Sequence, residues 1–241
     1  MTSPLRVLPV LLAAACAGNS PAQAPSSPLE VQVWGSLPGM HKRGEIDALV
    51  TLDTLLPAEN AFALGARAGL LGEITVADGT AYVARTEGTR EVSNTKGRDL
   101  DDGACLLVWA VVPRWQVQTI DRAVPIAELG EYLAEKIGHD GPTPFRIVGL
   151  FKELDWHVVD GPTAPGIEAS CEAHSAAGIR FQAEGLLNAQ LVGFWSTEHK
   201  AIFTRHDSLH HTHVIVSGAE PRTGHVDGGV IPAGCALLLP E

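Results

Sequence analysis

Basic residues are scarce in this sequence, where 17 Lys and Arg stand against 28 Asp and Glu and give a formal net charge of -11. No basic stripe runs along any segment, and aromatic residues do not alternate with basic ones. Proteins that bind nucleic acid carry clustered positive charge because the phosphate backbone has to be neutralised. The composition therefore argues against nucleic acid as a partner.

Apolar runs of membrane-spanning length are also lacking. The run Val7–Ala15 is well short of the roughly 20 residues that cross a bilayer. It follows Arg6 and precedes Cys16, which is typical of a secretory signal, so we expect export. Two processing sites remain open. Cleavage before Cys16 would give a periplasmic or cell-envelope lipoprotein, membrane-bound only through a lipid on Cys16; this is the interpretation we favour over cleavage after Ala24.

Residues Ala17–Pro28 are rich in Ser, Pro and Ala and have too little apolar surface to order themselves. We therefore expect residues 1–28 to be a signal and tether outside the fold. No cysteine pair has CxxC spacing, and the three cysteines after Cys16 allow one disulfide at most. Cys105 and Cys235 lie in apolar runs, which is typical of buried free thiols.

Short apolar runs bounded by turn residues predict a chain rich in strands. Asp78-Gly79 predicts a two-residue hairpin turn, and Pro125–Ile137, followed by Gly138, has the apolar spacing of a helix. The expected strands are Val31–Trp34, Ala61–Ala68, Glu73–Ala77, Thr80–Arg85, Leu106–Val112, Phe145–Phe151, Asp155–Val159, Phe181–Glu184, Gln190–Trp195, Ala201–Thr204, His211–Ser217 and Ala236–Leu239.

Many strands with one or two helices predict an α+β fold with two packed mixed β-sheets. The segment Gly161–Gly166 (GPTAPG) is the most linker-like in the chain. We therefore expect an N-terminal β-rich subdomain over residues 29–160 and a C-terminal one over residues 161–241.

Six of the ten histidines fall between residues 199 and 225. Alternate side chains of a strand share a face, so His211 and His213 can reach one metal ion. His225 follows after a turn-forming segment that can return the chain as a hairpin, which adds a third imidazole. An HxH pair alone is more typical of the polar face of an exposed strand, and the third histidine and the glycine-rich turn are what favour a metal site here. The remaining three, His199, His206 and His210, are expected to be ordinary surface residues.

Three imidazoles with an open position are typical of a catalytic divalent-metal site, with zinc the expected ion and iron, manganese or copper as alternatives. The C-terminal subdomain should therefore carry this metal site.

Three motifs, GLFKEL (residues 149–154), LVGFW (191–195) and HTHVIVSGAEPRTGHVDG (211–228), resemble in order and spacing the acetolactate decarboxylase family. The resemblance covers most of Leu29 to Leu239. It implies the family's fold, a homodimer, and decarboxylation of 2-acetolactate to acetoin at a divalent metal. A metal-dependent lyase for another branched 2-hydroxy-3-oxo acid, or an exported lipoprotein that only binds a metal or ligand, is the alternative.

The same resemblance implies roles for particular residues. His211, His213 and His225 match the metal ligands, Arg146 matches an arginine that holds the substrate, and Glu73 matches a glutamate at the metal that can handle a proton. On their spacing alone, Glu73 and Arg146 would be taken for surface residues. The family also returns a glutamate to the site from its C-terminal tail, so we expect Glu241 either to take that position or to leave it empty.

Overall fold

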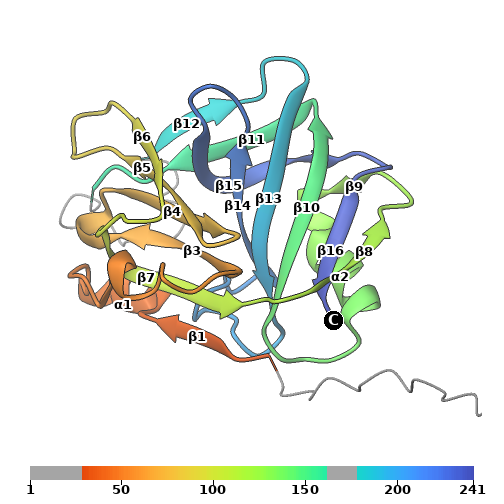
Figure 1. Ribbon diagram of the computed structural model, residues 1–241, viewed down its shortest axis with the longest axis horizontal. Helices are drawn as coiled ribbons and strands as arrows, with labels where there is room; N and C mark the ends of the chain where they lie inside the picture. Colours follow the sequence, from red (N-terminus) through yellow and green to blue (C-terminus); the bar gives the residue numbers. More distant parts are fainter. Residues whose placement is uncertain (1–28, 162–177) are drawn as a thin grey trace, which may run out of the picture.

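The computed structural model describes residues 29–161 and 178–241, which form two sheets packed face to face (Figure 1). The seven-stranded sheet has the order β1-β7-β3-β4-β5-β6, with β2 beside β7. Its strands are β1 (Val31–Trp34), β2 (Val50–Thr51), β3 (Ala61–Arg67), β4 (Gly72–Ala77), β5 (Thr80–Arg85), β6 (Ser93–Gly97) and β7 (Gly103–Val111).

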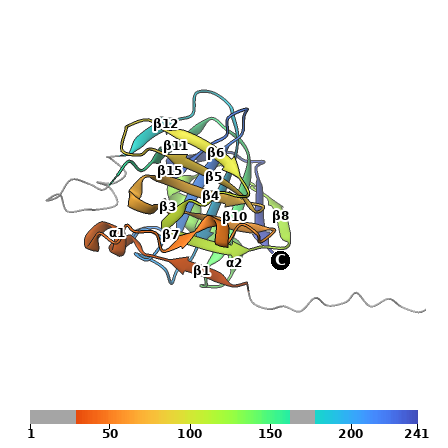
Figure 2. The same cartoon turned by 60° about the vertical axis from the view of Figure 1, so that its left-hand side comes forward.

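The nine-stranded sheet has the order β12-β11-β15-β14-β13-β10-β16-β8, with β9 beside β15. Figure 2 shows the strands of the first sheet running crosswise over those of the second. The strands are β8 (Trp115–Thr119), β9 (Val124–Pro125), β10 (Thr143–Phe151), β11 (Glu153–Val158), β12 (Ile179–Gln182), β13 (Leu187–Trp195), β14 (His210–Val216), β15 (Arg222–Ile231) and β16 (Ala236–Pro240).

Two short α-helices and three 3-10 turns complete the described residues. Helix α1 (Leu37–Arg43) begins at Ser36, whose hydroxyl accepts a hydrogen bond from the Gly39 N–H at 3.1 Å, and ends at Gly44 with φ 66°. Helix α2 (Leu129–Ile137) ends at Gly138 with φ 74°. The 3-10 turns are η1 (Leu52–Thr54), η2 (Ala68–Leu70) and η3 (Ile126–Glu128).

The core has three parts because side chains alternate across each sheet. Between the sheets, Phe62 and Leu64 of β3 pack with Val192 and Phe194 of β13. Helix α2 covers the far face of the nine-stranded sheet, and η1 covers the far face of the seven-stranded one. The face between the sheets is therefore mostly apolar, and polar groups there need a specific reason.

The expected α+β class, with two packed sheets and few helices, is confirmed. The expectation of mixed sheets is wrong, because the named strands pair antiparallel throughout the described residues. The chain passes from the seven-stranded to the nine-stranded sheet between β7 and β8, near Pro113, whereas the sequence predicted the boundary between subdomains at residue 160. Strands β10 and β11 precede residue 160 and nevertheless pair with β13 and β15. The linker prediction, from residue 162 onwards, lies outside the described residues.

The strand expected over Ala201–Thr204 is wrong. This segment forms a turn in which Ala201 has φ 59°, a conformation that does not occur in a strand. Helix α1 and the polar strand β6 were not expected, because neither has an apolar periodicity. The hairpin at Asp78-Gly79 is confirmed, with φ 51° and 67° at the two turn residues.

The expected helix Pro125–Ile137 is confirmed over η3 and α2. Cys105 and Cys235 are buried free thiols, as expected. The signal, tether, Cys16 and Cys171 lie outside the described residues. Neither helix in the described ranges has the length and apolarity that crossing a bilayer would require.

Candidate active site

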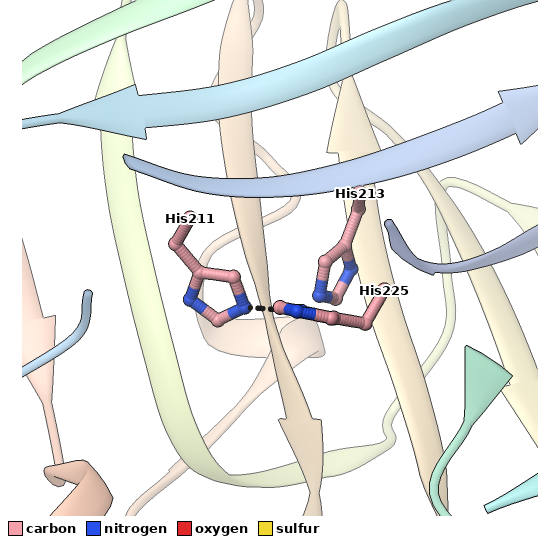
Figure 3. A group of neighbouring side chains, drawn as sticks. All are labelled: His211, His213 and His225. Atoms are coloured by element: carbon pink, nitrogen blue, oxygen red, sulfur yellow. Dashed lines mark hydrogen bonds between the residues drawn. The ribbon is translucent and has the colours of Figure 1, made fainter. Parts of the chain in front are cut away.

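Three histidines converge between the two sheets. On β14, His211 and His213 point to the same side, and His213 pairs with His225 on the neighbouring strand β15. Figure 3 shows the three rings pointing toward one another. The strand His211–Ser217 and the return of the chain as a hairpin are thus both confirmed.

The ring nitrogens fit a metal ion. One nitrogen from each ring lies within 4.8 Å of the others, and His211 Nε2 is 3.0 Å from His225 Nδ1. His211 Nδ1 and His213 Nε2 are buried and make no hydrogen bond. Buried nitrogens without partners are costly, and a cation shared by the three rings, bound to the His211 nitrogen that faces His225, would satisfy His213 Nε2. The donor set of three imidazoles suits zinc among the divalent ions.

Burial sets the protonation of this cluster. It lowers the pKa of His211, His213 and His225 well below the ordinary value, and the charges of neighbouring imidazoles lower it further. The neutral rings that result at neutral pH are the form that binds metal.

Glu73 lies across the interface on β4. Its Oε2 is 3.7 Å from His213 Nε2, and its Oε1 accepts a hydrogen bond from the Val159 N–H at 3.3 Å. Burial raises the pKa of this carboxyl well above the ordinary value. The sequence reasoning alone took Glu73 for a surface residue, but it is 5% exposed and faces the histidines.

A cavity of about 480 Å³ opens beside the cluster. His211, His225 and Glu73 line it, and His213 is fully buried behind them. The apolar part of the wall includes Leu37, Met40, Leu70, Leu106, Val159 and Phe203. The cavity can therefore present a small molecule to the imidazoles and to Glu73.

Arg146 lies in a row of directly paired residues that crosses the strands of the nine-stranded sheet and includes two of the three clustered histidines, His213 and His225. Neighbouring residues in this row, taken from β10, β13, β14, β15 and β11, are Arg146, Val192, His213, His225 and His157. Arg146 is two strands from His213, about 10 Å between Cα atoms at the usual strand spacing. Its Nη1 is 2.9 Å from an oxygen of Asp78 in the β4–β5 turn. It does not line the cavity, whereas Arg205 does.

His157 and Asp227 belong to the site and were missed. The ring of His157 is centred 5.0 Å from that of His225, and its Nδ1 is 2.8 Å from the Asp227 carboxylate. Both residues line the cavity. The strand Asp155–Val159 was expected, but nothing in the sequence indicated that it pairs with β15.

His210 is not an ordinary surface residue. It points away from His211, as expected, but Nδ1 is 2.8 Å from Thr212 Oγ1 and Nε2 is 3.1 Å from the Ile126 carbonyl oxygen. Burial lowers its pKa to about 4. His199 is also partly covered, by stacking on Phe203, while His206 is exposed as expected.

The terminal residue Glu241 lies away from the cavity. Its carboxylate is 2.5 Å from Arg114 Nε in an exposed ion pair, and it does not line the cavity wall. The carboxyl group that lies 3.7 Å from the ligand candidate His213 is that of Glu73. Of the two expected outcomes for the C-terminal glutamate, the structure therefore shows the one in which Glu241 does not take that position.

Comparison with known proteins identifies the family. The sequence profile of Alpha-acetolactate decarboxylase matches residues 42–234. The chain belongs to the alpha-acetolactate decarboxylase family. It is accordingly an enzyme of this kind, and the resemblance noted in the motifs is confirmed. A search of curated protein sequences gave no significant match.

Solved structures of the acetolactate decarboxylase fold are similar to this chain. The alpha-acetolactate decarboxylase of Bacillus subtilis strain 168 has 17% identity and a TM-score of 0.69, covering 88% of this chain and 85% of that one. The enzyme of Bacillus subtilis subspecies spizizenii has 19% identity and a TM-score of 0.69, with 87% and 85% covered.

A Staphylococcus aureus protein of unknown function, described as similar to alpha-acetolactate decarboxylase, has 15% identity and a TM-score of 0.66, with 88% and 84% covered. At such low identities these structures establish the shared fold alone.

Proposed function

We propose that this enzyme decarboxylates 2-acetolactate to acetoin and requires a divalent cation, with zinc expected, bound by His211, His213 and His225. The observation that carries the proposal is the convergence of three buried imidazoles beside a cavity, with one nitrogen of each within 4.8 Å of the others, in a chain of this family. Structural metal sites are usually closed by four protein ligands, whereas a three-histidine set leaves room for substrate.

The reaction needs stabilisation of negative charge and a proton. When the bond from the hydroxyl-bearing carbon to the carboxylate breaks, carbon dioxide leaves and the electron pair stays on the substrate as an enediolate. A divalent cation bound by the imidazoles supplies Lewis-acid stabilisation for this charge. One proton added to the carbon then gives acetoin.

Glu73 is the proposed proton donor. Burial raises its pKa and so favours the protonated carboxyl that a donor requires. Because Oε1 accepts a hydrogen bond from the Val159 N–H, the acidic proton belongs on Oε2, the oxygen nearer His213. The apolar wall around it limits competing proton transfer from water.

An arginine is the proposed partner of the substrate carboxylate. The resemblance assigns this role to Arg146, but only Arg205 lines the cavity. Both arginines already contact a carboxylate, Arg146 that of Asp78 and Arg205 that of Asp207, so the difference between them is their position relative to the cavity. We therefore propose that Arg205 makes the first contact with the carboxylate, with Arg146 as the alternative that the resemblance supports.

We further propose export, with residues 1–28 removed or lipid-anchored through Cys16, and assembly as a homodimer. Cys16→Ser should abolish labelling by a radioactive fatty acid if Cys16 carries the lipid. Light scattering of a chain beginning near Leu29 should give twice the chain mass. A monomeric mass would contradict the dimer, and retained label would contradict the lipid anchor.

The enzyme assignment is tested by substrate competition. Zinc-loaded protein should convert racemic 2-acetolactate to acetoin and carbon dioxide in equal amounts. The homologue with an ethyl group in place of the methyl should react more slowly. Faster reaction of the homologue would identify a lyase for another branched 2-hydroxy-3-oxo acid, and silence on both would point to a binding protein.

A further inference from the structure

Both ring nitrogens of His213 face side chains of β4 on the opposite sheet. Nδ1 lies 3.0 Å from Thr75 Oγ1, and Nε2 lies 3.7 Å from Glu73 Oε2. Glu73 and Thr75 are two residues apart, so they share one face of the strand. His213 and Thr75 have no exposed surface. The protein itself therefore decides which nitrogen of His213 carries the hydrogen.

Two threonine hydroxyls extend this contact in one direction. Thr75 Oγ1 is 2.6 Å from Thr223 Oγ1, and Thr223 Oγ1 donates to the Val214 carbonyl oxygen at 2.8 Å. A hydroxyl has one hydrogen to donate, and a carbonyl oxygen only accepts. Thr223 thus uses its hydrogen on Val214, and Thr75 uses its own on Thr223. What Thr75 offers His213 is a lone pair, so Nδ1 must carry the hydrogen.

If the two hydroxyls donated in the opposite direction, hydrogen-bonding groups would be left without partners. If Thr223 donated to Thr75, and Thr75 to Nδ1, the Val214 carbonyl would lose its hydroxyl donor. The hydrogen of His213 would then sit on Nε2, which has no hydrogen-bond partner, since Glu73 Oε2 is too distant at 3.7 Å. A buried N–H without an acceptor is unfavourable. The contacts His213–Thr75, Thr75–Thr223 and Thr223–Val214 are all hydrogen bonds only if His213 donates to Thr75, Thr75 to Thr223 and Thr223 to the Val214 carbonyl.

We propose that Thr75 and Thr223 are positioning residues for His213, forming a hydroxyl chain that fixes the Nδ1–H tautomer and leaves the Nε2 lone pair for the divalent cation. The metal part of this inference rests on the proposed function. Hydrogen bonds from the second nitrogen of a ligand histidine commonly tune metal affinity. Here the hydroxyl chain connects the seven-stranded sheet, through Thr75, to the proposed ligand His213 on the other sheet by hydrogen bonds.

The tautomer can be read without metal. Long-range proton–nitrogen correlation spectra of the ¹⁵N-labelled full chain, stripped of metal at mildly alkaline pH, should show His213 protonated on Nδ1, with the signal assigned by His213→Gln. In Thr223→Val, the Thr75 hydrogen has Nδ1 as its remaining acceptor, and this donation competes with the Nδ1–H form, so the share of the Nδ1–H tautomer should fall. Thr75→Ser should keep Nδ1–H. An Nε2–H wild type, or an unchanged share of Nδ1–H in Thr223→Val, overturns the proposal.

Zinc affinity gives the second readout, by competition with a chromogenic chelator. Thr75→Val and Thr223→Val should bind zinc about 10- to 100-fold more weakly, and Thr75→Ser should bind as the wild type does. Thr143→Val is the matched control, since Thr143 is also buried and its hydroxyl lies 3.4 Å from His139 Nε2, away from the cavity. Equal losses in Thr143→Val overturn the proposal. A wild type that shows Nδ1–H but takes up no zinc contradicts the proposed function and not the hydroxyl chain.

Discussion

Glu73 Oε2 on one sheet lies 3.7 Å from His213 Nε2 on the other. The proposed proton donor and a proposed metal ligand therefore come from opposite sides of the interface. Neither sheet alone contains the site, so catalysis should depend on how the sheets pack. Burial between the sheets also produces both pKa shifts, upward for Glu73 and downward for His213.

Removing a histidine ligand should remove the metal. His211→Ala and His213→Ala each leave two protein ligands, and zinc affinity should fall at least about 100-fold. Zinc per chain after gel filtration is the measurement. His206→Ala is the control because His206 is exposed and outside the cluster. Full zinc content in His213→Ala would show that the metal binds elsewhere.

Glu73→Gln should separate chemistry from metal binding. The amide keeps the size and the hydrogen bond from Val159 but has no acidic proton, so turnover should fall by about 100-fold. Rates must be compared at equal zinc occupancy. If Glu73→Gln formed acetoin at the wild-type rate, another group would have to be the donor.

The two arginines should differ in their effect on substrate binding. Arg205→Lys keeps the charge but loses the planar fork, and we expect KM for 2-acetolactate to rise about tenfold. Arg146→Lys should raise KM less, because Arg146 does not line the cavity, whereas Arg205 does. Steady-state kinetics on both variants show which arginine contributes more to binding of 2-acetolactate. The opposite ranking would return the role to Arg146.

The ion pairs of Asp102 should matter for stability. Asp102 is 6% exposed and bonds Arg67 Nε at 2.8 Å and the Arg85 guanidinium, joining the ends of β3 and β5. Asp102→Asn leaves two partly buried guanidinium groups without their anion, so the free energy of unfolding should fall by about 3 kcal/mol.

Urea denaturation measures this change. Glu45→Gln is the matched control, because its ion pair with Arg43 is exposed and should contribute nothing measurable. Equal stability of Asp102→Asn and the wild type would show that this buried pair does not hold the sheet.

Cys105 should be unreactive in the folded protein. Burial raises the pKa of its thiol to about 11, so almost no thiolate, the reactive form, is present at pH 8. In a background with the other three cysteines changed to Ser, iodoacetamide should label Cys105 only in denaturant. Rapid labelling of the native protein would show that the core around Cys105 opens.

The sequence predicted the local features of the site well. Alternation within a single strand was enough to place His211 and His213 on one face, and turn residues were enough to return His225 beside them. The same alternation correctly turned His210 away from His211. It could not show that Ile126, from a distant turn, covers His210.

The sequence patterns did not predict which strands distant in the chain pair or pack together. His157 joins the site because β11 pairs with β15, and Thr75 because β4 packs across the interface, and neither contact leaves a local pattern. For Glu73 and Arg146, spacing alone favoured surface positions, and only the family resemblance predicted that they belong to the active site. The sheet division near Pro113 was missed because a strong linker signal at residue 161 does not reveal which strands pair.

The dependence of acetoin formation on metal occupancy tests the central claim most directly. Full-length protein stripped of metal and reloaded with graded zinc should form acetoin from 2-acetolactate in proportion to the zinc bound, and His213→Ala should stay inactive at every zinc level. Acetoin formed at the same rate by the stripped protein, or none formed by the fully loaded one, would contradict the account.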